Sequence, residues 1–346
     1  MELEELKAEI EDLHTKRQFS AIKTILNQLN PADIAQLLEE FSNEERLLFF
    51  RLLGKEEAAD TFVELEPDNQ KALIHAFSDN ELREVLDELY LDDTVDMIEE
   101  MPATVVKRIL RNTDVETRAS INTLLRYPED SAGSIMTPEF VDLKRDMTVE
   151  DAFKRIRRTG VDKETIYTCY VTDASRHLLG VTTVKELLLH DQDDRIEAFM
   201  ETNVIYVNTL SDQEEAAAQL SKYDFLALPV VDLEERLVGI ITVDDAMDVI
   251  QEENTEDIQK MNAIVPTERT YLKTGVLATW KSRIPWLLLL MVSATFTGSI
   301  ITSFEDKLAS MIILTSFIPM LMDTGGNSGG QASVTVIRAL SLNEIN

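Results

Sequence analysis

The distribution of hydrophobic residues divides the chain into a long charged part and a short apolar part. Residues 1–283 mix charged and apolar positions, whereas residues 284–304 (IPWLLLLMVSATFTGSIITSF) contain no charged side chain over 21 positions. About 20 consecutive apolar residues cross a bilayer as a helix. A second stretch begins at Leu308, and its single charged residue before Arg338 is Asp323. Two such stretches in succession predict an α-helical transmembrane segment with two spans.

A repeat of 24 residues occupies much of the first 125 positions. Segments that begin at Asp33, Glu57 and Glu81 align with one another, and a second segment follows each. Apolar residues recur at i, i+3, i+4 and i+7 in every segment, which is typical of short amphipathic helices. Helix pairs at a fixed period stack into a solenoid. The pattern predicts an all-α superhelical domain over residues 1–130.

A second repeat, with a period near 60 residues, follows the first. Met136 aligns with Met200, and Gly180 aligns with Gly239. Each copy has the order strand, helix, strand, turn, strand, helix, which is the pattern of tandem cystathionine-β-synthase (CBS) domains. The sequence therefore predicts two α/β domains, residues 131–198 and 199–252.

Local signals within these copies mark their helix starts and turns. Thr148-x-x-Asp151 and Ser211-x-x-Glu214 predict capping-box helix starts. The segments 173–177 and 232–236, which lie between β-branched runs, predict hairpin turns.

The composition excludes several classes of protein. With 64 Asp and Glu against 33 Lys and Arg, the formal net charge is −31, which argues against nucleic-acid binding and favours cations as partners. The single cysteine, Cys169, lies in a predicted buried strand and reads as a core residue. The four histidines are scattered without a zinc-binding spacing. No pairing of nucleophile and base is evident, so we do not expect an enzyme.

Basic residues indicate the orientation in the membrane. Lys273, Lys281 and Arg283 precede the first span, whereas Glu305 and Asp306 follow it. Under the positive-inside rule, the N-terminal domains lie in the cytoplasm. The expected location is the cell membrane, with a multi-pass topology.

Carboxylates are concentrated in the second CBS-like copy and the segment after it. Residues 201–262 contain 15 acidic and 3 basic residues. Asp245 and Asp248 stand at i, i+3, as do Glu253 and Glu256, so each pair shares a helix face and its members repel each other. Two readings remain: a solvated acidic surface, or a cluster that requires cations to be compact.

The second apolar stretch contains an unusual polar motif. Glycines stand at positions 325, 326, 329 and 330, with Asp323 and Asn327 one helical turn apart. Close helix packing would explain the glycines alone. A carboxylate and an amide at membrane depth are costly unless they line a polar path. We therefore interpret Asp323 and Asn327 as pore-lining residues, and Mg²⁺, which keeps several waters, suits such a lining.

The order of these modules resembles the MgtE family of magnesium channels and transporters. The segment 319–340 (PMLMDTGGNSGGQASVTVIRAL) is similar to the pore signature of that family. The resemblance implies a connecting, plug-like helix at 253–280 and a transmembrane region from 281 to 346. Because the family has five transmembrane helices and this chain contains two predicted spans, we expect the sequence to be a fragment.

The resemblance also implies a function and a set of sites. It implies a homodimeric Mg²⁺ channel or transporter subunit, gated by cytosolic Mg²⁺ that draws the connector 251–270 into one position and closes the pore. Thr242 and Asp245 match the ribose-contacting positions of a CBS nucleotide site, so ATP is a second expected ligand. The alternative is a membrane-tethered nucleotide or ionic sensor that regulates a separate partner and conducts nothing. The implied metal-binding carboxylates are Asp92, Asp96, Asp212, Glu214, Asp224, Asp245, Asp248, Glu253, Glu256 and Asp257.

Overall fold

The computed structural model describes residues 3–262, 264–266 and 274–341. The chain forms two compact units, Met1–Met247 and Asp248–Asn346. The first unit contains the helical domain and both CBS copies. The second contains most of α14 (Val243–Met261) and the apolar helices.

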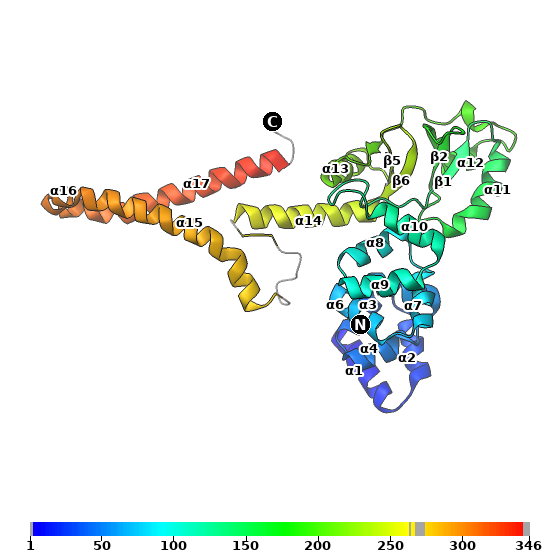
Figure 1. Ribbon diagram of the computed structural model, residues 1–346, viewed down its shortest axis with the longest axis horizontal. Helices are drawn as coiled ribbons and strands as arrows, with labels where there is room; N and C mark the ends of the chain where they lie inside the picture. The colour runs from blue at the N-terminus through cyan, green and yellow to red at the C-terminus, as the bar shows by residue number, and fades with distance from the viewer. Residues whose placement is uncertain (1–2, 263, 267–273, 342–346) are drawn as a thin grey trace. The chain divides into compact units, whose positions relative to one another are not determined.

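Ten helices precede the first strand in the described part of the chain (Figure 1). Successive odd-numbered helices α3, α5, α7 and α9 contact one another, and α4 contacts α6, which is the arrangement of a short solenoid. The helices are α1 (Leu3–Thr15), α2 (Phe19–Leu26), α3 (Pro31–Glu39), α4 (Asn43–Phe50), α5 (Lys55–Val63), α6 (Pro67–Ala76), α7 (Asp79–Leu86), α8 (Leu91–Glu99), α9 (Ala103–Asn112) and α10 (Val115–Leu124).

Local chemistry explains where these helices begin. Ser42 and Ser78 cap α4 and α7 in capping boxes with the Glu residue three positions later. Pro31 and Pro67 occupy the first helical position, where a missing N–H costs nothing. The apolar face of each helix is buried, with Ile34 and Leu73 almost inaccessible to solvent. The predicted superhelix is confirmed.

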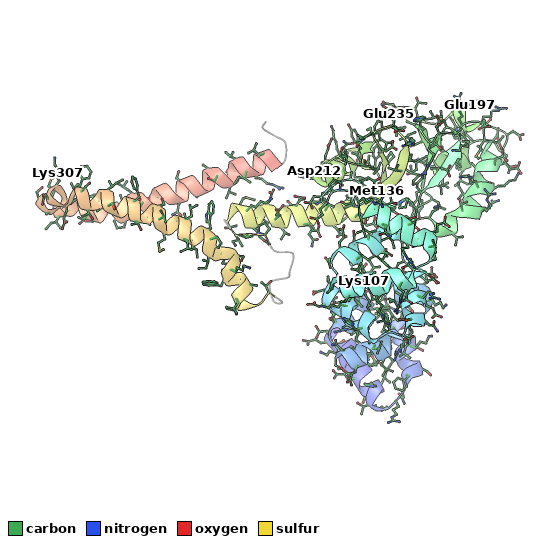
Figure 2. The ribbon with its side chains drawn as sticks, viewed as in Figure 1. Lys107, Met136, Glu197, Asp212, Glu235 and Lys307 are labelled. Carbon is green, nitrogen blue, oxygen red and sulfur yellow. The ribbon has the colours of Figure 1, made fainter. Side chains whose placement is uncertain are left out.

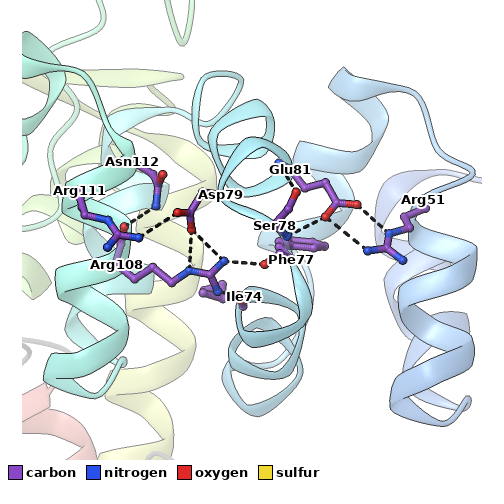
Figure 3. Close-up of polar contacts among 9 residues, drawn as sticks. All are labelled: Arg51, Ile74, Phe77, Ser78, Asp79, Glu81, Arg108, Arg111 and Asn112. Atoms are coloured by element: carbon purple, nitrogen blue, oxygen red, sulfur yellow. Dashed lines mark hydrogen bonds and ion pairs between the residues drawn. The ribbon is translucent and has the colours of Figure 1, made fainter.

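Arginines connect neighbouring layers of the solenoid (Figure 3). Arg51 Nε, just after α4, donates to Glu81 Oε1 of α7 at 2.8 Å. Arg51 and Ser78 together hold the pKa of Glu81 at about 2, because both stabilise the ionised carboxylate. Arg108 of α9 pairs with Asp79 and donates to the carbonyl oxygen of Phe77, which caps the end of α6.

Each CBS copy contains a three-stranded sheet in which the first strand is parallel to the second and the second is antiparallel to the third. Helix α11 (Val149–Thr159) packs on β1 in the first copy, and α13 (Gln213–Tyr223) contacts β5 in the second. The strands are β1 (Val141–Lys144), β2 (Thr168–Thr172), β3 (Leu178–Thr183), β4 (Val207–Asn208), β5 (Ala227–Val231) and β6 (Leu237–Thr242); shorter helices are η1 (Gly160–Asp162), α12 (Val184–Leu189) and η2 (Ile196–Ala198).

The two copies exchange edge segments. Thr137 pairs with Ile240 on β6, whereas Glu201 pairs with Val181 on β3, each through two backbone hydrogen bonds of 2.8–2.9 Å. The opening segment of the first copy thus extends the sheet of the second (Figure 2 labels Met136), and the start of the second extends the sheet of the first. Each copy therefore contributes backbone hydrogen bonds to the sheet of the other.

Most of the predicted turns and caps occur where expected. Thr148 caps α11, and the hairpins at 173–177 and 232–236 join β2 to β3 and β5 to β6. The predicted cap at Ser211 is wrong by one residue. Asp212 is the N-cap of α13 and accepts the N–H of Glu214 at 2.9 Å, because an Asp carboxylate caps a helix as well as a Ser hydroxyl does.

The apolar part of the chain is helical in the described residues. It contains α15 (Val276–Ser303), α16 (Glu305–Ser310), η3 (Ile312–Ser316) and α17 (Phe317–Ser341). Among the helices that the structure describes, only α15 is long and apolar enough to cross a membrane by length and composition, so the second predicted span is not confirmed. Residues 263 and 267–273, which include Lys273 and part of the predicted connector 251–270, lie outside the described residues.

Candidate metal centre

Two helices, α8 and α14, begin with the same acidic pair, and both pairs lie in the first unit. Asp92 and Asp93 lie in the first turn of α8, and Asp244 and Asp245 lie in the first turn of α14. Carboxylates are favoured there locally, because the N-terminus of a helix carries a partial positive charge. The fold brings the two acidic helix starts close enough for Asp245 to influence the ionisation of both Asp92 and Asp93.

Two further carboxylates come from loops of the first CBS copy. Glu139 Oε2 accepts the backbone N–H of Leu91, the first residue of α8, at 3.0 Å. The N–H of Glu164 donates to the carbonyl oxygen of Glu139 at 2.9 Å. Glu164 Oε2 is buried without a hydrogen-bond partner. We call Asp92, Asp93, Glu139, Glu164, Asp244 and Asp245 the acidic cluster.

Burial and neighbouring negative charges raise the pKa values of three members of the acidic cluster, Asp92, Asp93 and Glu164. Asp92 is 6% exposed, and burial followed by the charge of Asp245 raises its pKa well above the ordinary value. Burial, then Asp245 and Asp244, raise the pKa of Asp93 to about 7. Burial, then Asp93 and Asp244, raise the pKa of Glu164 to about 8. Buried carboxylates that raise one another's pKa need either protons or a cation to be stable.

The ligand atoms of the acidic cluster, which are carboxylate oxygens, suit a hard divalent cation. Carboxylate oxygens are the ligands of Mg²⁺ and Ca²⁺, and Glu164 Oε2 is an oxygen that nothing else satisfies. Among the residues the structure describes, no three His, Cys, Asp or Glu side chains form a ready-made coordination site. Mg²⁺ usually keeps several of its waters. Carboxylates that do not form a ready-made coordination site would therefore hold it largely through those waters.

The structure places two of the carboxylates implied by the resemblance, Asp92 and Asp245, in the acidic cluster. Asp96 lies one turn after Asp92 on α8, on the exposed side. The sequence reasoning missed the other four members, Asp93, Glu139, Glu164 and Asp244. The recurrence of an Asp-Asp pair at the start of a helix, at 92–93 and 244–245, was a signal for two of them. The two loop glutamates carry no such signal.

The three carboxylates implied around α13 do not meet. Asp212 and Glu214 lie at its start (Figure 2 labels Asp212), whereas Asp224 follows its last residue in the left-handed conformation. The helix has 11 residues. At 1.5 Å per residue its ends are about 16 Å apart, too far for one ion. Within this chain, Asp224 therefore cannot share a single ion with Asp212 and Glu214.

The remaining acidic residues lie on α14 within the second unit. Asp248, Glu253, Glu256 and Asp257 occupy this helix, which continues without a break past residue 252. Lys260 forms an ion pair with Glu256 and has its pKa raised by Glu256, Glu253 and Asp257. A lysine of the same helix therefore neutralises part of the negative charge of α14.

The residues proposed for ATP lie at the edge of the acidic cluster. Asp245 accepts hydrogen bonds from the hydroxyl and the backbone N–H of Thr242, which completes the N-terminus of α14. At the start of α12, the Glu186 carboxylate accepts the backbone N–H of Thr183, whose hydroxyl in turn accepts the N–H of Glu186. The carboxylates around Asp245 favour a cation over a triphosphate at this position.

The predicted pore residues lie one turn apart on α17. Asn327 Nδ2 donates to Asp323 Oδ2 at 3.4 Å. The helix is continuous through the four glycines. A Cβ built at any of these glycines meets no atom within 4 Å, so this face of α17 is open within the chain.

An acidic helical solenoid joined to an intertwined CBS pair, with a membrane-length apolar helix beyond, defines a class of CBS-containing membrane proteins. Comparison with protein families agrees: the MgtE intracellular N domain matches residues 29–130, and the CBS domain matches 132–193 and 196–252. The chain is 38% identical to the magnesium transporter MgtE of Thermus thermophilus over 346 residues, 99% of this chain and 77% of that protein. It is 32% identical to the Bacillus subtilis transporter of the same name, covering 94% and 71%.

Solved structures give the same result. The cytosolic domain of the Mg²⁺ channel MgtE in complex with ATP superposes with a TM-score of 0.67 at 38% identity, covering 70% of this chain and 99% of that one. The soluble part of a magnesium transporter gives a TM-score of 0.67 at 32% identity, covering 73% and 99%. The chain belongs to the MgtE family of magnesium transporters.

Proposed function

We propose that the chain moves Mg²⁺ across the cell membrane as part of a transporter that is gated by cytosolic Mg²⁺ at the acidic cluster. The observation that carries the proposal is the pair of acidic helix starts, α8 and α14: burial and the charges of Asp244 and Asp245 raise the pKa values of the α8 carboxylates. Membership of the MgtE family supports the transported ion.

Electrostatics supplies the driving force. Two unit charges 4 Å apart repel by about 4 kcal/mol at an effective dielectric of 20. Without a divalent cation, several such repulsions oppose the packing of α8 against the CBS pair. A bound Mg²⁺ reverses their sign. Because the ion binds the compact arrangement better, it shifts the population toward that arrangement.

We assign the compact arrangement to the closed state. High cytosolic Mg²⁺ would then stop further entry, which is negative feedback on uptake. The sign follows the gating that the family resemblance implies. The connection to the pore would run along α14, since this helix starts in the acidic cluster with Asp244 and Asp245.

The proposal is tested by neutralising the two carboxylates at the start of α8, Asp92 and Asp93. Asp92→Asn/Asp93→Asn keeps the side-chain shape and the acceptor for the Asp93 N–H, which bonds Asp92 Oδ1 at 3.1 Å. In the wild type, millimolar Mg²⁺ should slow limited proteolysis and raise the unfolding temperature, and the variant should require at least tenfold more Mg²⁺. Asp87→Asn, at the exposed C-cap of α7, is the matched control.

The ionic-strength control decides between the two readings of the acidic surface. If NaCl at equal ionic strength protects the wild type as well as Mg²⁺ does, the carboxylates are a screened surface and the gating proposal fails. A nucleotide as a second regulator is supported by the relative that was solved with ATP. We further propose that the chain acts as a homodimer and has no enzymatic activity.

A further inference from the structure

A basic cavity is lined mainly by the first CBS copy, with Leu237 of β6 contributed by the second, and lies within the same unit as the acidic cluster. Its volume is about 300 Å³. Three of its residues are basic and one is acidic, although the whole chain has a net charge of −31. The lining residues are Pro138, Phe140, Asp142, Arg155, Thr159, Lys163, Thr172, Arg176 and Leu237.

The basic side chains reach the cavity from three different elements. Arg155 of α11 is held by the carbonyl oxygen and the carboxylate of Asp142 on β1. Lys163 comes from the connection between α11 and β2. Arg176 lies in the β2–β3 hairpin turn with φ of 71°, a left-handed conformation that is uncommon for a residue other than glycine. At the edge, Lys144 Nζ donates to Thr172 Oγ1 at 2.7 Å.

The second CBS copy serves as an internal comparison. Its hairpin has Glu235 in the same left-handed conformation, with φ of 60°, where the first copy has Arg176 (Figure 2 labels Glu235). Alignment of the buried faces of α11 and α13 places Gln219 where the first copy has Arg155. The connection from helix to strand is five residues longer in the first copy, and Lys163 lies in the extra length. The CBS fold therefore forms without these basic residues.

We propose that this cavity binds a small phosphate-bearing anion. Arginine and lysine together recognise phosphate oxygens by charge-assisted hydrogen bonds. Phe140 and Leu237 give the cavity an apolar side that would accept the carbon part of a small organic phosphate. The volume lies at the lower end of ligand pockets, which suits a ligand of this size.

The cavity and the acidic cluster share two short segments. Pro138 and Phe140 line the cavity and flank Glu139 of the cluster, and Lys163 precedes Glu164. The Glu164–Glu139 backbone hydrogen bond of 2.9 Å joins the two segments. An anion in the cavity adds negative charge beside the cluster, so it should strengthen cation binding there, and the cation should strengthen anion binding equally. This coupling rests on the proposed cation site; the anion site does not.

Anion binding is tested first without Mg²⁺, on the full chain in detergent, by calorimetric titration with inorganic phosphate. The wild type should show one saturable site. Lys163→Met/Arg176→Glu should weaken the affinity at least tenfold. Because Glu235 already occupies the equivalent conformation in the second copy, Arg176→Glu should fold, and circular dichroism checks this. Arg158→Gln, exposed on α11 outside the cavity, should change the affinity less than twofold.

Three results would overturn the proposal. They are the absence of saturable phosphate binding, equal binding by the double variant, and displacement of phosphate by micromolar ATP, which would make the cavity part of a nucleotide site. The coupling has its own measurement: saturating sulfate should lower the Mg²⁺ concentration at half-maximal thermal stabilisation at least twofold. If phosphate binds but sulfate leaves this Mg²⁺ concentration unchanged, the coupling is wrong and the anion site stands. If phosphate binds but Mg²⁺ does not stabilise the protein at all, the result counts against the proposed gating and not against the anion site.

Discussion

The backbone N–H of Leu91 donates a hydrogen bond of 3.0 Å to the carboxylate of Glu139. Leu91 is the first residue of α8, and the side chain of the N-cap residue Tyr90 makes no capping hydrogen bond. A glutamate from the first CBS copy therefore caps a helix of the solenoid. The contact ties the two domains together at the acidic cluster.

Glu139→Ala should destabilise the protein by about 1 kcal/mol, since removal of an N-cap acceptor costs roughly 0.5–2 kcal/mol. Urea unfolding without Mg²⁺ measures the change in the free energy of unfolding. Glu9→Ala, an exposed carboxylate on α1, is the control and should change it by less than 0.5 kcal/mol, roughly the limit for surface substitutions. A gain in stability from Glu139→Ala would mean that repulsion within the acidic cluster outweighs the cap.

Stability without Mg²⁺ should fall as the pH rises from about 5 to about 8. The pKa of Asp93 is raised to about 7 and that of Glu164 to about 8, so the folded state holds protons that the unfolded chain releases. Stability is then lost as the pH rises through these folded-state values, by at most about 1.4 kcal/mol per pH unit for each proton. Urea midpoints at four pH values, in EDTA, measure the slope.

Two comparisons assign that slope to the acidic cluster. Asp93→Asn/Glu164→Gln should flatten it, because neither replacement titrates. Mg²⁺ should flatten it as well and should stabilise more at pH 8 than at pH 6, since a metal competes with protons for carboxylates. A slope that is the same in the variant would place the titrating groups elsewhere.

The sequence predicted the architecture well because each part has its own periodicity. The 24-residue repeat and the near-60-residue repeat both reflect local packing, which a pattern of apolar residues reports directly. The loop carboxylates Glu139 and Glu164 could not be found in this way. Their role comes from a tertiary contact between the first CBS copy and α8, and nothing in their immediate neighbours records it.

Glycines 180 and 239 occupy equivalent positions in the two CBS copies, but the sequence repeat does not show why a glycine is needed there. Their alignment was evident from the sequence, but its cause is the exchange of edge segments. A Cβ at 180 would lie 2.8 Å from the carbonyl oxygen of Glu201, and one at 239 would lie 2.6 Å from Met136 Sδ. Neither glycine needs a positive φ. The side chain is excluded by close approach alone.

Gly180→Ala should therefore cost more than Gly239→Ala, because the backbone oxygen of Glu201 lies 2.8 Å from a Cβ at 180. At 239 the nearest atoms belong to the movable Met136 side chain, and the backbone oxygen of Thr137 lies farther away, at 3.0 Å. We expect about 1–3 kcal/mol for Gly180→Ala, the usual range for overpacking. Gly54→Ala, where a Cβ meets nothing within 4 Å, is the control. Thermal unfolding gives the order of the three variants. Equal effects at 180 and 54 would contradict the exchanged-edge explanation.

The polar residues of α17 also explain why this helix is less apolar than α15. Asp323, Asn327 and Gln331 follow one another at intervals of four, so they form a polar stripe along one face. Such a stripe suits a helix that lines a water-filled path, and Asn327 already donates to Asp323. In the full-length transporter, Asp323→Ala and Asn327→Ala should each reduce Mg²⁺ uptake at least tenfold without altering expression. Ser328→Ala, next to the stripe, is the control. Normal uptake by both variants would leave close packing of the glycines against another helix as the better explanation of this motif.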